Sequence, residues 1–142
     1  MATRNGSAEW RGELKDGAGS VTVGDGVFEG AYSFSSRFEE GEGTNPEELI
    51  AAAHASCFAM ALSGVLTQNG NAPEVIRATA RVHLRNIDGA PTIARIDLDV
   101  EATVSGLDDE SFQAQAQEAK AGCPVSRALA GVPEIELTAR LA

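Results

Sequence analysis

The sequence has few cysteines and few basic residues. It contains two cysteines, and its 11 lysines and arginines face 21 aspartates and glutamates, which gives a formal net charge of −10 at pH 7. An acidic surface of this kind repels the phosphate backbone of nucleic acids and anionic lipid headgroups. We therefore expect neither a nucleic-acid partner nor a membrane partner.

An export signal is also missing from the beginning of the sequence. Residues 1–17 contain no apolar segment of the kind that a secretory signal needs. The expected location is therefore the cytoplasm, where two cysteines indicate thiol chemistry more often than a structural disulfide. The apolar run at residues 44–66 approaches membrane-spanning length, but its acidic start and high alanine content favour a helix in a protein core.

The sequence shows neither internal repeats nor low-complexity segments, and its length fits one domain, residues 1–142. Hydrophobic periodicity and turn residues predict an α+β fold with mostly antiparallel strands. The expected elements are strands at 8–14, 20–23 and 32–34, a polar loop at 35–43, a helix at 44–66, strands at 76–87 and 96–104, helices at 108–121 and 125–130, and a strand at 135–141.

The predicted helix at residues 44–66 organises the rest of the chain. Asn45 is a good N-cap, and Glu48 stands three residues later, as in a capping box. After Glu48 the helix is apolar on every side, so we expect it to be buried all round. His54 and Cys57 are the chemically notable residues of this run.

The strands at 76–87 and 96–104 are expected to form a hairpin with one solvated face. Basic residues and a histidine alternate on the first strand, and acidic residues alternate on the second. Cross-strand pairs of opposite charge would each stabilise the register by roughly 0.2–1 kcal/mol.

The two cysteines allow several interpretations. A cysteine inside a buried helix, such as Cys57, is most often a small hydrophobic residue. Cys123 stands between Gly122 and Pro124 at the start of a short helix, where backbone N–H groups favour a thiolate, although a structural thiol is equally compatible. His54, Cys57 and Cys123 could together ligate a metal, but without a CxxC or HxxxH pair a metal site is disfavoured, and His54 alone is more typical of a core histidine.

A third interpretation is a peroxidatic pair, in which one thiolate attacks a peroxide and a second thiol captures the resulting sulfenic acid. Cys57 lies too deep in its helix to benefit from the helix dipole, so it needs a cation from elsewhere. Arg37, in the loop before the helix, is the candidate. A carboxylate from Glu47 or Glu48 could orient its guanidinium, because bidentate pairs fix geometry.

Two motifs carry a family resemblance. Residues 44–58 read TNPEELIAAAHASCF and residues 121–126 read AGCPVS. Together they resemble the OsmC/Ohr family of osmotically inducible and organic-hydroperoxide-resistance proteins, which are thiol peroxidases, and HASC and CPVS are more similar to the OsmC branch.

The resemblance implies a role for each candidate residue. Cys57 would be the peroxidatic nucleophile and Cys123 the resolving thiol, while Arg37 would hold the thiolate and Glu47 would orient Arg37. Glu48 is assigned to the capping box. The family fold wraps antiparallel sheets around long central helices in an intertwined homodimer. The implied substrates are organic hydroperoxides and, more weakly, hydrogen peroxide, with a dihydrolipoamide-like dithiol as reductant and neither a metal nor another cofactor.

Helix geometry adds a prediction about the dimer. Glu47 and Cys57 are ten residues apart, or about 15 Å along a helix. An arginine paired with Glu47 is therefore expected to serve Cys57 of the other subunit. Apolar candidates for a substrate pocket are Ile50, Phe58, Met60 and Leu129, although each is more typical of plain core. The alternative from another class is a dimeric redox sensor or small-ligand binder that uses the same thiols without turnover.

Overall fold

The computed structural model describes residues 2–142. The chain divides into two compact units, Met1–Leu49 and Ile50–Ala142, which are described separately. The division falls within helix α2 (Pro46–Gln68), whose first turn belongs to the first unit. A single domain over residues 1–142 stays a prediction.

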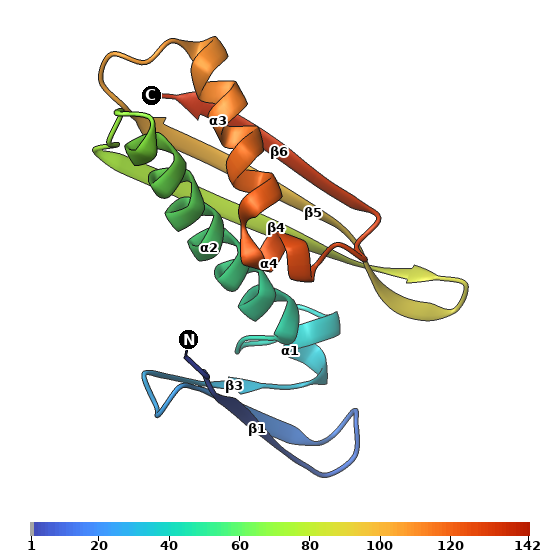
Figure 1. Ribbon diagram of the computed structural model, residues 1–142. Coiled ribbons are helices and arrows are strands. Elements are labelled where there is room, and N and C mark those ends of the chain that lie inside the picture. The colour runs from blue at the N-terminus through green and yellow to red at the C-terminus, as the bar shows by residue number, and fades with distance from the viewer. Residues whose placement is uncertain (1) are drawn as a thin grey trace. The chain divides into compact units, whose positions relative to one another are not determined.

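The first unit is built on a three-stranded antiparallel meander. Strands β1 (Gly6–Arg11), β2 (Ala18–Val23) and β3 (Phe28–Tyr32) pair in the order β1-β2-β3 (Figure 1). The rings of Trp10 and Tyr32 pack against each other with their centroids 5.4 Å apart, so an aromatic pair joins the two outer strands.

The segment after β3 corrects two predictions. The third strand spans Phe28–Tyr32 and not residues 32–34, and the expected loop at 35–43 begins with a short helix, α1 (Phe34–Phe38). Ser33 caps this helix: its side chain accepts a hydrogen bond from the amide of Ser36, whose hydroxyl in turn accepts from the Ser33 amide. The reciprocal serine pair stabilises a turn of helix in a segment that looks entirely polar.

The first unit buries almost nothing. Within residues 2–49 only Ser36 and Glu47 are buried. Its large apolar side chains stay exposed, namely Leu14, Val23, Val27, Phe28 and Phe38. A small sheet without a buried apolar face is marginal in water, so this unit requires a covering surface.

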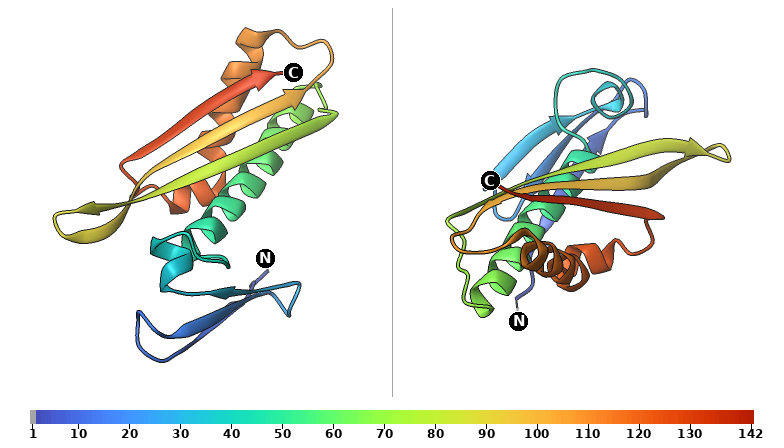
Figure 2. Two further views of the ribbon diagram at one scale, coloured as in Figure 1. Left: turned by 180° about the vertical axis from the view of Figure 1, so that it is seen from behind. Right: turned by 90° about the horizontal axis from the view of Figure 1, so that it is seen from above.

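The second unit contains a three-stranded sheet. Strands β4 (Val75–Ile87) and β5 (Ala90–Thr103) form the predicted antiparallel hairpin, and β6 (Glu134–Leu141) pairs in parallel with β5, so the order is β4-β5-β6 (Figure 2). The parallel pairing follows because the chain returns to the sheet through two helices, α3 (Asp109–Gly122) and α4 (Pro124–Ala128).

The helices of this unit cover one face of the sheet (Figure 1). Side chains from α2, β5 and α3 form one apolar core, which comprises Phe58, Leu62, Leu66, Leu98, Val100, Ala102, Phe112, Ala116, Ala119 and Cys123. The beginning of α4 therefore lies against the same core that holds the middle of α2.

One chain buries only part of helix α2, so burial of this helix on every side, which was expected with a second chain as cover, stays a prediction. Beyond Leu49, its buried side chains are His54, Phe58, Leu62 and Leu66, which recur every fourth residue along one stripe. Met60 is 77% exposed. In length and composition α2 resembles a membrane-spanning helix, but its buried stripe belongs to a protein core and its first turn carries two glutamates.

Candidate active site

The two cysteines, 66 residues apart in the sequence, meet in the second unit. Cys57 is half-buried in the middle of α2, whereas Cys123 is fully buried between α3 and α4. Both are free thiols, and their Sγ atoms lie 2.9 Å apart, within hydrogen-bonding distance. The sulfurs lie at a separation from which a disulfide can form with little movement.

Local sequence explains how Cys123 is held. Its amide closes the last turn of α3 on the carbonyl of Ala119, 2.9 Å away, and Pro124 then opens α4 at a position where a missing N–H is harmless. The Cys123 side chain is itself the N-cap of α4, because its Sγ accepts the amide N–H of Ser126 over 3.5 Å. The sulfur is thus tied to the end of one helix and the beginning of the next.

The two thiols differ in acidity. Burial raises the pKa of Cys57, and the Cys123 thiol raises it further, against a smaller lowering by a backbone hydrogen bond from Val125. Burial also acts to raise the pKa of Cys123, but hydrogen bonds from Cys57 and from the amide and hydroxyl of Ser126 outweigh it, so that the pKa is lowered. Within one unit, therefore, Cys123 is the more acidic thiol and Cys57 lacks a cation.

Arg37 and Glu47 meet in the first unit. The Arg37 Nη2 lies 2.8 Å from Glu47 Oε1, and its Nε donates to the same carboxylate at 3.1 and 3.3 Å. Glu47 is buried at 8% exposure, whereas the Arg37 side chain is 37% exposed. This fork geometry fixes the direction of the guanidinium.

Glu48 has different partners. Its amide donates to Asn45 Oδ1 over 2.8 Å, which is the expected cap of α2. Its carboxylate accepts from the Asn45 side-chain amide and from the Thr44 hydroxyl. Of the two glutamates considered from the sequence, Glu47 is the one that contacts Arg37.

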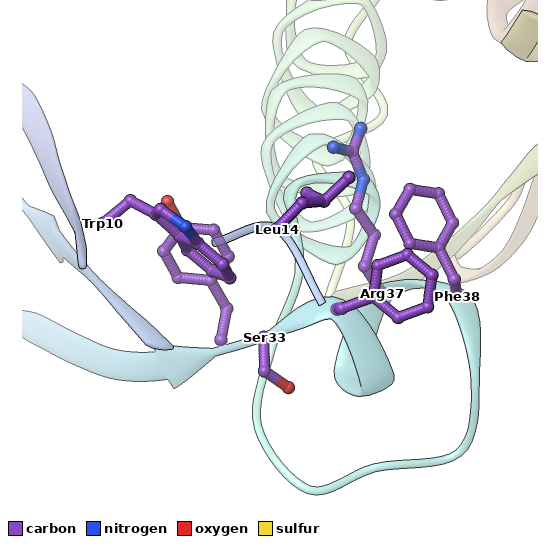
Figure 3. Close-up of a pocket in the computed structure, with 7 residues that line it drawn as sticks. Trp10, Leu14, Ser33, Arg37 and Phe38 are labelled. Carbon is purple, nitrogen blue, oxygen red and sulfur yellow. The ribbon is translucent and has the colours of Figure 1, made fainter. Parts of the chain in front are cut away.

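Arg37 also borders a pocket of about 230 Å³ within the first unit. Its lining consists of Trp10, Leu14, Tyr32, Ser33, Phe34, Arg37 and Phe38. Figure 3 shows the guanidinium with Leu14 on one side and Phe38 on the other, and the Phe38 ring centroid lies 5.3 Å from the guanidinium carbon. An apolar cleft beside a cation suits a molecule with an oily tail and a polar head.

The pocket candidates from the sequence lie elsewhere. Phe58 is core, Met60 is exposed, and Ile50 and Leu129 are partly buried. The aromatic pocket residues of the first unit were missed, because strands β1 and β3 and helix α1 bring them together from positions far apart in the sequence.

His54 and Ser126 form a second contact between α2 and α4. His54 is fully buried, and its Nε2 lies 2.7 Å from the Ser126 Oγ. The sequence pointed to His54 but not to Ser126, because only the fold brings α4 against α2. The contact directs the His54 Nε2 to a hydroxyl, and residues 2–142 contain no cluster of three or more His, Cys, Asp or Glu side chains suited to a metal.

Comparison with known proteins places this geometry in a family. Residues 39–138 match the family described as OsmC-like protein. The chain is 47% identical over 127 residues to the peroxiredoxin OsmC of Escherichia coli, with 89% of each chain covered. It is 32% identical over 122 residues to the organic hydroperoxide resistance protein OhrB of Bacillus subtilis, covering 84% of this chain and 88% of the relative.

Solved structures agree with the sequence relatives. The crystal structure of an organic hydroperoxide resistance protein from Elizabethkingia anophelis superposes with a TM-score of 0.74 at 25% identity, covering 99% of both chains. That of Bacillus subtilis OhrB gives a TM-score of 0.70 at 26% identity, covering 97% of this chain and 98% of the other. Motifs, fold and relatives converge, and the chain belongs to the OsmC family.

Proposed function

We propose that this protein is a cysteine-based peroxidase that reduces organic hydroperoxides. The observation that carries the proposal is the meeting of two free thiols, one in the middle of α2 and one at the cap of α4, with their sulfurs 2.9 Å apart. The names of its relatives, a peroxiredoxin and organic hydroperoxide resistance proteins, support the same class of reaction.

The proposed cycle has three steps. The Cys57 thiolate attacks the outer peroxide oxygen, the O–O bond breaks, and the leaving alkoxide takes a proton to become an alcohol, leaving a Cys57 sulfenic acid. The Cys123 thiolate then attacks the Cys57 sulfur, and the departing hydroxide takes a proton to become water. A dithiol finally reduces the Cys57–Cys123 disulfide and becomes a disulfide itself.

Arg37 and Glu47 complete the proposed site. Burial raises the pKa of Cys57, so the thiolate requires a nearby cation, and Arg37 is the cation that its pairing with Glu47 holds in a fixed direction. Because Glu47 and Cys57 are about 15 Å apart along α2, Arg37 acts on Cys57 of a second copy of the chain.

Uncovered apolar surface supports the homodimer. The first unit buries no apolar side chain in residues 2–49. The exposed side of α2 carries Ala52, Ser56, Met60 and Gly64. Three of these residues are small, which allows another helix to approach closely. A second copy covers both surfaces at once, as an isologous interface does.

The proposal extends to the substrate, the reductant and the location. The aromatic pocket beside Arg37 favours hydroperoxides with apolar tails over hydrogen peroxide, since each buried CH₂ contributes roughly 0.8 kcal/mol. A small dithiol such as dihydrolipoamide is the reductant, and the protein acts in the cytoplasm.

The test is a peroxide panel with cysteine variants. With cumene hydroperoxide and a dithiol, we expect the parent protein to consume the peroxide catalytically and Cys57→Ser to consume none. Cys123→Ser should turn over once and then form sulfinic acid, which mass spectrometry detects. Ser105→Ala, which removes an exposed hydroxyl, serves as the control. Consumption that stops at one equivalent in the parent protein would instead identify a redox sensor.

A further inference from the structure

His54 is a buried titratable group that the proposed peroxidase cycle does not use. It is fully buried, and among residues 2–142 its Nδ1 has no hydrogen-bond partner. Leaving a buried polar atom unpaired costs about 1–3 kcal/mol. A leucine would fill the space without that cost, so the imidazole calls for an explanation.

The other imidazole nitrogen connects His54 to the thiols. Nε2 lies 2.7 Å from the Ser126 Oγ, and the Ser126 amide donates to the Cys123 Sγ over 3.5 Å. The Cys123 Sγ in turn lies 2.9 Å from the Cys57 Sγ. The buried imidazole of α2 thus contacts the side chain of the residue whose amide caps the Cys123 sulfur at the beginning of α4.

The direction of the hydrogen bonds can be assigned. Burial lowers the pKa of His54, so the imidazole is neutral and carries one proton. The side chain of Ser126, like its amide, acts to lower the pKa of Cys123. With the proton on Nε2, the imidazole donates to the Ser126 hydroxyl oxygen and the unpaired Nδ1 is a vacant acceptor, which is a less costly vacancy than a buried N–H would be.

We propose that His54 and Ser126 are positioning residues that hold Cys123 as the attacking thiolate, with His54 acting through the Ser126 hydroxyl. The inference rests on the proposed function and specifies its resolving step. Cys123 must be deprotonated to attack the sulfenic acid, and the Ser126 amide, which donates to this buried sulfur over 3.5 Å, stabilises that charge. The neutral imidazole, through its contact with the hydroxyl, holds Ser126 where its amide meets the sulfur.

Other titratable and charged groups near Cys123 are the same in every comparison below. Cys57 faces it from α2, and Lys120 of α3 and Arg127 of α4 line a neighbouring pocket with Ser126. None of these is changed in the variants, except that Cys57 is replaced throughout the titration series.

The first experiment titrates Cys123 without any peroxide. In a Cys57→Ser background, the ultraviolet absorbance of the thiolate is followed against pH. We expect Ser126→Ala to raise the midpoint by about one pH unit and His54→Leu to raise it in the same direction. Ser126→Thr keeps the hydroxyl and His54→Gln keeps an N–H donor, so the midpoint of each should stay close to that of the Cys57→Ser protein. Ser105→Ala should leave the midpoint unchanged.

The second experiment measures the resolving step with both cysteines present. After one equivalent of cumene hydroperoxide, we expect Ser126→Ala to form the disulfide about tenfold more slowly, which corresponds to a pKa shift of about one unit. Sulfinic acid should accumulate in this variant, while Cys57 oxidises at the parent rate. Ser126→Ala is the smaller change, so we expect it to fold as the parent protein does when checked by circular dichroism, and it decides the question if His54→Leu unfolds.

The outcomes separate this inference from the proposed function. An unchanged Cys123 midpoint in Ser126→Ala overturns the positioning role, whatever the protein does with peroxides. A shifted midpoint in a protein that consumes no hydroperoxide supports the positioning role but overturns the peroxidase. A shifted midpoint with an unchanged rate of disulfide formation also contradicts the inference, because the thiolate would then not govern that step.

Discussion

The chemistry of individual residues depends on how each charge is compensated. Cys57 has its pKa raised by burial and by Cys123, whereas the guanidinium of Arg37 is held by a buried carboxylate in a fork. The proposed activity therefore requires a cation that is both near Cys57 and correctly oriented.

Arg37→Lys and Glu47→Gln test these two requirements separately. Lysine keeps the charge but loses the fork, so we expect the rate of Cys57 oxidation to fall by about tenfold to a hundredfold, equivalent to about 1.4–3 kcal/mol. Glu47→Gln keeps the shape and loses the charge, and it should show a smaller fall of the same kind. Single-turnover kinetics with cumene hydroperoxide measures both, with Glu48→Gln as the neighbouring control. Equal losses in Glu47→Gln and Glu48→Gln would argue against an orienting role for Glu47.

Several site residues were predictable from sequence, and others were not. The spacing of Asn45 and Glu48 reveals the start of α2, and Cys57 and Cys123 stand out because the chain has no other cysteine. The partner of His54 could not be inferred, because Ser126 reaches it only through the fold. Which thiol is more acidic also depends on hydrogen bonds that no spacing reveals.

At the scale of elements, alternation identified the long hairpin correctly but not its ion pairs. Asp97 of β5 bonds to His83 across the strand at 2.7 Å and to Arg95 on its own strand at 2.8 Å. Arg140 of β6 pairs with Asp99 and Glu101. The expected pairing of opposite charges is present, but part of it comes from the parallel strand β6. The alternation within the hairpin does not predict where β6 lies in the sheet.

The carboxyl of Asp97 predicts a dependence of stability on pH. His83 first, and then Arg95, lower its pKa below the usual range, so the unfolded chain binds this proton more readily than the folded one. Its contribution to stability is complete above the unfolded pKa, about 3.9, and is lost as pH falls through the lower folded value. The free energy of unfolding, measured with urea, should therefore be lower for Asp97→Asn than for the parent protein near neutral pH. The two values should converge in acid. A difference that persists unchanged in acid would show that the carboxylate charge is not responsible.

Short elements account for most of the errors. Helix α1 was expected as loop because its polar sequence conceals the Ser33–Ser36 pair, and β3 was placed a few residues too late. Periodicity is a strong signal over the length of α2, β4 and β5 but a weak one over five residues.

At the scale of the whole molecule, one chain leaves apolar surface that needs a partner. The uniform apolar character of α2 predicts that a second copy of the chain covers it, and one chain by itself buries only one stripe of this helix. Hydrophobic periodicity alone gives the number of apolar faces on this helix but not the surfaces that cover them.

Met60→Glu tests that cover directly. Met60 is 77% exposed in one chain, so an isolated chain should tolerate the charge, whereas a dimer would bury it without a partner. We expect a shift toward monomer and a loss of peroxidase activity, measured by sedimentation and turnover, while Gln68→Glu near the end of α2 leaves both intact. A fully dimeric Met60→Glu protein would place the interface elsewhere.

Mixing subunits tests whether sites are shared between chains. Arg37→Ala and Cys57→Ser proteins are each expected to be inactive, and a mixed dimer should regain about one site of two if Arg37 of one chain serves Cys57 of the other. Inactive mixed dimers, once shown to have formed, would contradict sharing.

The sulfur that begins α4 has a consequence for what a reductant encounters. A thiolate accepts hydrogen bonds strongly, whereas a sulfur already bonded to another sulfur accepts them poorly, so oxidation weakens the cap that holds residues 124–128 in place. Each catalytic round would thus loosen this short segment at the moment when an outside thiol must reach the bond beneath it. Amide hydrogen exchange in that segment should be faster in the oxidised protein than in the reduced one, and entry for the reductant would open only when there is something to reduce.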